Sequence, residues 1–108
     1  MRLGMRISPR DPRLAFWGWA MAVYMLHGER VVEALAEAHS AQERDPRFYL
    51  ARILEAGALA RLGRLSEVHA PLRRARQLRP PLTLDEVRHT HGRRVAADIA
   101  PFWDAVVE

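Results

Sequence analysis

Proline recurs along this chain every 34 residues, at Pro12, Pro46 and Pro80. The first two prolines stand in the same tripeptide, Asp-Pro-Arg, and a glycine lies near the middle of each interval, at Gly28 and Gly63. A fixed period of this length is typical of proteins built from repeated units, each of which buries its apolar face against the next. The spacing therefore predicts two such units within the 108 residues.

Apolar residues within each interval predict helical hairpins. They recur three or four positions apart, which is the period of an α-helix, and no stretch alternates as a strand would. We expect helices over residues 12–27, 31–44, 46–62 and 65–78, with aspartate caps and first-turn prolines on the first and third. The predicted inward faces are Leu14, Trp17, Met21, Tyr24 and Met25; Val31, Leu35, Ala38 and Ala41; Leu50, Ile53, Leu54, Ala58 and Leu62; and Leu65, Val68, Leu72, Ala75 and Leu78.

The turns and one proline give three further expectations. Gly28 and Gly63 are expected to end the first and third helices, with Gly28 in the left-handed conformation. The first turn is one residue longer than the second, an insertion expected to bend the first hairpin. Pro71 lies inside the fourth helix, where proline removes a hydrogen bond and clashes with the preceding turn, so we expect a kink or a late helix start.

The pattern changes after the paired prolines at positions 80 and 81. Thr83 and Glu86 form a capping box, which predicts a short helix to about His89. Residues 92–94 are expected to form a loop. Asp98 would cap a last helix, with Pro101 in its first turn and a packing surface of Phe102, Trp103, Val106 and Val107. This tail is predicted to cover the open end of the stack.

Both intervals resemble tetratricopeptide repeats. The resemblance in the second interval lies in Leu62-Gly63-Arg64-Leu65-Ser66-Glu67, Leu72, Ala75, Leu78 and Pro80, and in the first in Trp17, Tyr24, Gly28, Glu33-Ala34, Ala41 and Pro46. It implies an all-α fold of antiparallel helix hairpins, stacked as a short solenoid with a C-terminal capping helix, that serves as a scaffold for protein–protein contacts. Its implied parts are residues 1–10, a remnant of a preceding repeat; 11–46 and 47–80, the two hairpins; and 81–108, the cap.

A narrower resemblance lies in Arg6-Ile7-Ser8-Pro9-Arg10-Asp11-Pro12 and the aromatic residues that follow. This run is similar to the C-terminal repeat region of bacterial class III adenylate and guanylate cyclases and of related winged-helix regulators. In such proteins the region follows a catalytic or DNA-binding domain. The resemblance implies an alternative function as a regulatory appendage, with any enzyme activity on residues outside this chain.

The first helix is apolar on more than one side. Phe16, Trp19, Ala20 and Val23 form a second apolar face, and a helix that is apolar all round needs cover on both sides. The chain supplies cover for only one of them. We therefore expect Phe16, Trp19 and Val23 to form an exposed apolar face, which a missing repeat or a second copy in a homodimer would cover unless it stays bare.

The net charge of +4 is unevenly distributed. Residues 1–46 carry six arginines against six acidic residues, residues 47–79 eight against two, and residues 80–108 three against five. A solvated face accounts for such a pattern, and so does a site for an acidic peptide or a nucleic acid. No aromatic residue interleaves with the arginines, which argues against nucleic acid. The basic-patch candidates are Arg61, Arg64, Arg73, Arg74, Arg76 and Arg79.

The resemblance also implies a peptide-binding groove lined by the first helix of each pair. The candidates for its lining are Gly18, Ala22, Arg52, Glu55 and Ala56. These residues would form a small and mostly neutral surface. Such a groove is suited to a protein or peptide partner with apolar or short side chains.

The sequence offers little for catalysis. It has no cysteine, its serines stand in no nucleophile motif and its glycines form no phosphate loop, so we expect neither enzyme activity nor a cofactor. Asp85, His89 and His91 offer three metal ligands without an obvious fourth, and no metal site is predicted. The longest uncharged apolar stretch, residues 14–26, is shorter than the roughly 20 residues of a membrane span, so we expect a cytoplasmic protein.

Overall fold

The computed structural model describes residues 12–103, with side chains from Phe16 onward, and every element in this range is helical. The predicted all-α class is confirmed. The remnant expected over residues 1–10, together with Val106 and Val107, lies outside the described residues. The elements are α1 (Pro12–His27), α2 (Val31–Arg44), α3 (Tyr49–Arg61), the short 3-10 helix η2 (Leu65–Glu67), α4 (His69–Leu78), α5 (Leu84–His91) and α6 (Arg93–Trp103).

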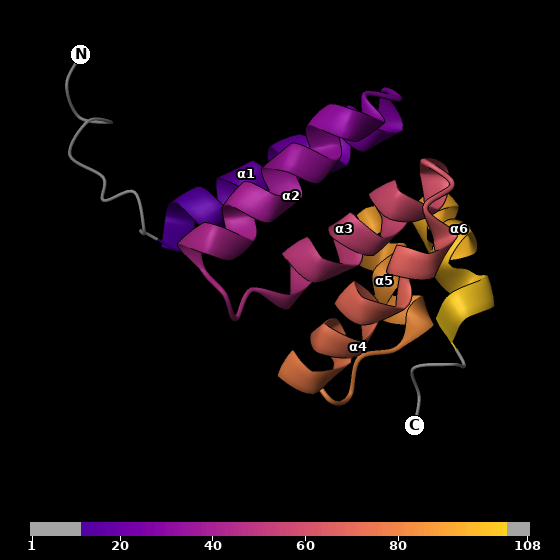
Figure 1. Ribbon diagram of the computed structural model, residues 1–108. Coiled ribbons are helices and arrows are strands. Elements are labelled where there is room, and N and C mark those ends of the chain that lie inside the picture. Colours follow the sequence, from indigo (N-terminus) through magenta and orange to yellow (C-terminus); the bar gives the residue numbers. More distant parts are fainter. Residues whose placement is uncertain (1–11, 104–108) are drawn as a thin grey trace, which may run out of the picture.

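Consecutive helices pack against one another along the chain (Figure 1). The antiparallel pair of α1 and α2 forms one side of the molecule, and α3 packs against α2. At the other end, α5 pairs with α6, and α6 turns back to lie against α3. One core joins all of them, and its largest fully buried apolar side chains are Leu26, Ile53, Leu54, Leu72 and Ile99.

The 34-residue period of the sequence is also present in the backbone. The N-cap of α2, Arg30, has φ −91° and ψ 66°, and the N-cap of η2, Arg64, has φ −86° and ψ 63° 34 positions later. Each N-cap arginine pairs with a glutamate three residues on, Arg30 with Glu33 at 2.6 Å and Arg64 with Glu67 at 2.7 Å. Helices α2 and α4 end at residues 44 and 78, again 34 positions apart.

Helices α1 and α3 end in the same hydrogen-bonded motif. In each, two successive N–H groups after the helix donate back to carbonyls of its last turn, and the residue that donates first has positive φ. That residue is Glu29 (φ 66°) after α1 and Gly63 (φ 77°) after α3. The bonds are Glu29 to Leu26 (3.1 Å) and Arg30 to Met25 (2.8 Å), then Gly63 to Ala60 (3.1 Å) and Arg64 to Leu59 (3.0 Å).

The expectation for Gly28 is wrong, because Glu29 takes the left-handed conformation in its place. Glu29 is the counterpart of Gly63, 34 positions earlier, so the two turns have the same length. The predicted one-residue insertion is therefore absent. It arose from aligning the turns on their glycines, although Gly28 stands one position before the residue whose backbone needs a glycine.

Opposite effects on stability are expected from Gly63→Ala and Glu29→Gly. An added Cβ at Gly63 would meet nothing within 4 Å, so the alanine gains no contact and bears only the strain of positive φ. We expect Gly63→Ala to lower the free energy of unfolding by about 1 kcal/mol, and Glu29→Gly to raise it by a smaller amount. Urea unfolding followed by circular dichroism measures both, and a stabilising Gly63→Ala would contradict this account.

Two helices begin later in the structure than the starts predicted at residues 46 and 65. The predicted start of the third helix at Pro46 is wrong: the Asp45 carboxylate accepts the Arg47 N–H at 3.1 Å, which makes a turn, and α3 follows at Tyr49. The late start expected near Pro71 is confirmed. Because α4 begins at His69, the proline lies in its first turn, where its missing N–H leaves no gap in the helix.

The tail agrees with the prediction in its first half only. Thr83 caps α5 by accepting the Glu86 N–H at 3.1 Å, as expected. The loop expected over residues 92–94 and the cap expected at Asp98 are wrong. Gly92, at φ 96°, separates α5 from a last helix that begins at Arg93. Asp98 consequently lies in the middle of α6, and Pro101 lies near its end instead of in its first turn.

Candidate functional site

One side of α1 has no protein cover within the described residues. Trp17, Met21 and Tyr24 follow one another at helical spacing on this side, with Phe16 beside them. Their exposed fractions are 67%, 54% and 75%, and 48% for Phe16. These four residues are called the outer face of α1 below. Aromatic side chains exposed to this extent on one helix are an unusual feature of a solvated surface.

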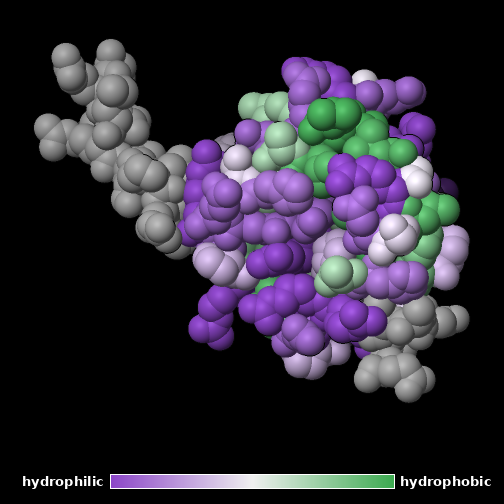
Figure 2. All heavy atoms as spheres, in the orientation of Figure 1, coloured by the Kyte–Doolittle hydropathy of each residue, from purple (hydrophilic) through white to green (hydrophobic). Residues whose placement is uncertain are grey.

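Hydrophobic surface is unevenly distributed over the side of the molecule that Figure 2 shows. Its largest area lies over the upper end of the α1–α2 hairpin and a smaller one at the right-hand edge, whereas the surface around α4 is hydrophilic. The other large apolar side chains that are exposed lie at the two turns or close to them, at Val32, Leu62 and Leu65. The outer face of α1 differs from these in its continuous run along one helix.

The structure reverses the two predicted faces of α1. Trp19 and Val23, expected to be exposed, pack against the core, and of the three predicted residues only Phe16 is exposed. Trp17, Met21 and Tyr24, which were assigned to the inward face, form the outer one. The tail contributes to this orientation, because Trp19 donates its indole N–H to His91 at the end of α5.

The counterpart of the outer face in the second hairpin is buried. Ala51, Glu55 and Ala58 lie 34 positions after Trp17, Met21 and Tyr24. Both alanines are fully buried, and Ala51 packs against Ala41 of α2. Glu55 accepts a hydrogen bond from Gln42 of α2 at 2.8 Å. The same side of the first helix is therefore covered by a neighbouring helix in one hairpin and bare in the other.

The predicted groove residues lie mostly between helices. Gly18, Ala22 and Ala56 are buried, and an added Cβ at Gly18 would approach Arg44 of α2 at 3.1 Å. Arg52 and Glu55 are partly buried, and Glu55 is bonded to α2 as described. Three of the five are therefore buried, and Gly18 and Glu55 lie against α2.

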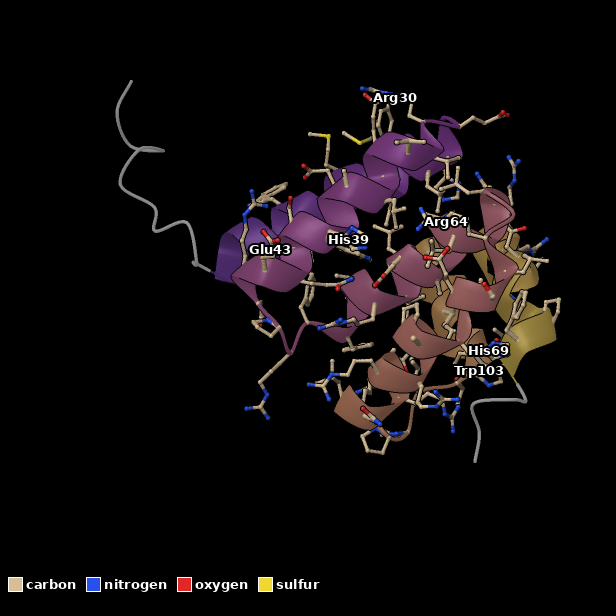
Figure 3. The ribbon with its side chains drawn as sticks, in the orientation of Figure 1. Arg30, His39, Glu43, Arg64, His69 and Trp103 are labelled. Atoms are coloured by element: carbon tan, nitrogen blue, oxygen red, sulfur yellow. The ribbon has the colours of Figure 1, made fainter. Side chains whose placement is uncertain are left out.

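The remaining side of α1 and α3 is covered by the tail. At Gly57 of α3 an added Cβ would lie 3.1 Å from Val95 of α6 and 3.7 Å from Leu26 of α1, so the glycine allows a close approach of three helices. The end of α6 also reaches α4: Figure 3 shows His69 and Trp103 close together, and the rings of His69 and Phe102 are 5.4 Å apart.

A buried histidine connects the tail to α1. His91, at the end of α5, is 1% exposed, and its Nε2 accepts the indole N–H of Trp19 at 2.9 Å. The proton of the neutral ring is thereby assigned to Nδ1, which lies 2.7 Å from the Thr90 hydroxyl oxygen. That hydroxyl donates in turn to the carbonyl of Glu86 at 3.1 Å. The bond from Trp19 requires an unprotonated Nε2, so it exists only while His91 is uncharged.

Burial lowers the pKa of His91 from 6.5 to about 4. Desolvation of the charged ring is the main cause, and the nearby His27 acts in the same direction. His27 is also held at this junction, where its Nε2 donates to the backbone carbonyl of His91 at 3.1 Å. The burial of His91 was not predicted, because nothing local in the sequence indicates a partner 72 positions away.

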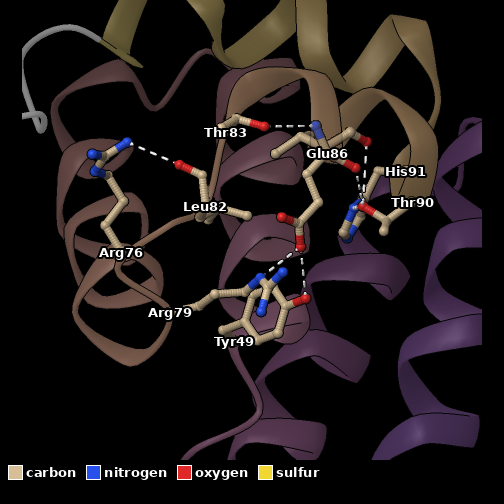
Figure 4. Close-up of polar contacts among 9 residues, drawn as sticks. Tyr49, Arg76, Arg79, Leu82, Thr83, Glu86, Thr90 and His91 are labelled. Atoms are coloured by element: carbon tan, nitrogen blue, oxygen red, sulfur yellow. Dashed lines mark hydrogen bonds and ion pairs between the residues drawn. The ribbon is translucent and has the colours of Figure 1, made fainter.

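A second polar cluster joins α3, α5 and the end of α4 (Figure 4). The Glu86 carboxylate accepts from the Arg79 guanidinium at 2.7 Å and from the Tyr49 hydroxyl at 2.9 Å, and Arg79 also lies over the Tyr49 ring. The hydrogen bond from Arg79 holds the pKa of Glu86 below its ordinary value. Glu86 therefore does not make the second bond of the predicted capping box, and Arg79 is part of this cluster.

Four of the six basic-patch candidates pair with an acidic residue or lie over an aromatic ring within the molecule. Arg61 is nearly buried and bonds Asp98 of α6 and the Leu26 carbonyl of α1, at 3.0 and 2.7 Å. Arg64 pairs with Glu67, Arg79 with Glu86, and Arg76 lies over the Trp103 ring. No ion pair within residues 12–103 includes Arg73 or Arg74, which are both exposed.

The structure separates the three residues considered as metal ligands. His91 points into the core, whereas His89 and Asp85 lie on the exposed side of α5. Across the described part of the chain, no three histidine or acidic side chains gather closely enough to share a metal ion. In the same range, no helix is both long and apolar enough to span a membrane.

Comparison of the chain with protein-family models, with curated proteins and with solved structures found no match in any of the three.

Proposed function

We propose that this chain is a non-catalytic protein–protein interaction module of the tetratricopeptide type, and that it binds a partner through the outer face of α1. Support for the repeat assignment comes from the backbone, in which the same turn, the same ion pair and the same helix end recur 34 positions apart. A hairpin repeat of this kind buries its apolar surface against its neighbours.

One observation carries the proposal. The side of α3 that corresponds to the outer face of α1 is covered by α2, so this fold already contains one example of a helix seated on that side. On α1 the same side is bare and bears three aromatic residues and a methionine. Aromatic side chains are enriched among the residues that dominate binding energy at protein interfaces. We infer that an apolar helix is the partner that fits.

The alternative of a regulatory appendage differs only in where that helix comes from. If this chain acts as the C-terminal region of a cyclase or a transcription regulator, a preceding helix of the same polypeptide covers the outer face. Binding of a nucleic acid or an acidic partner through the arginines has less support, because Arg61, Arg64, Arg76 and Arg79 are engaged within the molecule.

Photo-crosslinking in the cells that make the protein tests the interaction surface. A photoreactive phenylalanine analogue placed at Trp17 or at Tyr24 should give a covalent adduct of defined mass, because both side chains point outward from α1. Mass spectrometry of the adduct identifies the partner helix.

The matched control is the same analogue at Leu65, which is 51% exposed but lies in η2, away from α1. We expect no adduct, or only a faint one, at this position. If residues 17 and 24 crosslink no more than residue 65, the outer face is not a binding surface and the proposed function is wrong. If a helix of the same longer polypeptide is captured, the appendage is supported.

A further inference from the structure

We propose that the helix covering the outer face of α1 is α1 of a second copy of this chain, packed antiparallel about a two-fold axis. This inference rests on the proposed function and names the partner of the same surface. It draws on three features of the outer face: the symmetry of its sequence, its area and its charge.

The outer face of α1 can pack against the same face of a second copy. In an antiparallel helix pair with two-fold symmetry, positions equidistant from the axis face each other. The midpoint of Trp17 and Tyr24 falls between Ala20 and Met21, so an axis at that point brings Trp17 against the partner's Tyr24 and Tyr24 against the partner's Trp17. Two aromatic pairs then flank a centre in which the small Ala20 leaves room for the partner's Met21.

The area is that of a weak specific dimer. With about 200 Å² for each aromatic side chain, the exposed fractions of the outer face amount to roughly 500 Å² per copy. Two copies would together bury about 1,000 Å², which is at the lower limit for a specific interface. We therefore expect a dissociation constant in the range of about 1–100 μM.

Charge favours this pairing over a head-to-tail arrangement. No charged residue occurs between positions 14 and 26, so in this pairing the two outer faces meet without burying a charged side chain of their own. In a head-to-tail stack the outer face would instead meet α4 of the next copy, where Arg73 and Arg74 are exposed. Burying those guanidinium groups against an apolar helix is costly, because they would lose water without gaining a carboxylate.

Sedimentation equilibrium of the full chain at about 1–500 μM tests the dimer, with this range chosen to span the expected constant. We expect a monomer–dimer equilibrium that Trp17→Glu and Tyr24→Arg each weaken at least tenfold. Leu65→Glu is the control and should leave the equilibrium unchanged, since Leu65 is similarly exposed elsewhere. Circular dichroism should show the same helix content for all variants, because every substituted side chain is at least half exposed.

Mixing the two variants tests the geometry. In the antiparallel pair, Glu at position 17 of one copy faces Arg at position 24 of the other, while Trp17 faces Tyr24 across the axis. We expect the mixture to dimerise at least tenfold more tightly than either variant alone.

If the chain is monomeric at all concentrations, the partner is not a second copy. If the mixture of the Trp17→Glu and Tyr24→Arg variants dimerises no more tightly than either variant alone, the proposed two-fold pairing is wrong. The photo-crosslinking experiment can still capture a different protein at position 17 in either case. Failure of this inference is therefore distinguishable from failure of the proposed function.

Discussion

Lowering the pH from 7 to 4 is expected to reduce the free energy of unfolding by about 3 kcal/mol through His91 alone. Its imidazole is 1% exposed, with its Nε2 accepting the Trp19 N–H, and the pKa of the folded ring is about 4 against 6.5 for an ordinary histidine. A charged ring would present an N–H to the indole N–H. Burial also removes the charged ring from water, which is the main reason why the folded state excludes the proton that the unfolded chain takes up.

The sign and the window follow from the two pKa values. Above pH 6.5 the ring is neutral in both states, and His91 adds no pH dependence. Between pH 6.5 and about 4 only the unfolded state binds the proton, so stability falls by about 1.4 kcal/mol for each pH unit. Below pH 4 both states are protonated and this contribution levels off. The lowered pKa of Glu86 adds a further loss at more acidic pH, where its folded-state carboxylate is finally protonated.

Urea unfolding at several pH values between 4 and 7.5 measures the effect. His91→Gln should lose most of the slope between pH 6.5 and 4, because glutamine can accept the Trp19 N–H without titrating. The matched control is His89→Gln, two positions away on the exposed side of α5, which should keep the wild-type slope. Equal slopes for wild type and His91→Gln would show that His91 is not the group responsible.

Arg61→Ala is expected to lower the free energy of unfolding by about 3 kcal/mol. The Arg61 side chain is 8% exposed and joins three helices, since it starts in α3 and bonds both Asp98 of α6 and the Leu26 carbonyl of α1. Removing it leaves the Asp98 carboxylate without its partner and takes one of two donors from the Leu26 carbonyl, which also accepts the Glu29 N–H. Denaturant unfolding monitored by circular dichroism measures the loss.

Two comparisons isolate the cause. Arg64→Ala removes another arginine of the predicted basic patch, but its pair with Glu67 is exposed, so stability should hardly change. In a double-mutant cycle, Arg61→Ala combined with Asp98→Ala should cost less than the two single changes together. Similar losses for Arg61→Ala and Arg64→Ala would contradict the role given to Arg61.

The local elements were predictable because their signals are local. The bounds of α2 match the prediction. The late start of α4 was predictable because Pro71 would clash with the preceding turn if the helix began at residue 65. Thr83 caps α5 through an N–H only three residues away. The recurrence of prolines also located the period of the backbone, since Pro46 and Pro80 each follow a helix end, at residues 44 and 78.

The candidate site was predicted only in part, because its faces depend on contacts between distant residues. A helix that is apolar on all sides carries no sequence signal for which side is buried, so the direction in which Trp17 and Trp19 point could not be read from α1 alone. It is set by His91, whose bond to Trp19 spans 72 positions. The exposed basic patch was also mispredicted. The partner of Arg61 is Asp98, 37 positions away, which was expected to cap the last helix and instead lies inside α6.

The return of α6 onto α3, and the bond from His91 to α1, change how this chain should unfold. In a linear array each repeat contacts only its neighbours, so end repeats fray independently and folding can spread from any point. Here His91 of α5 holds α1, and the first and last described helices share one core. Losing either end exposes the other, which favours a single cooperative transition. The long-range closure also slows folding, because a large loop must form before its contacts stabilise it.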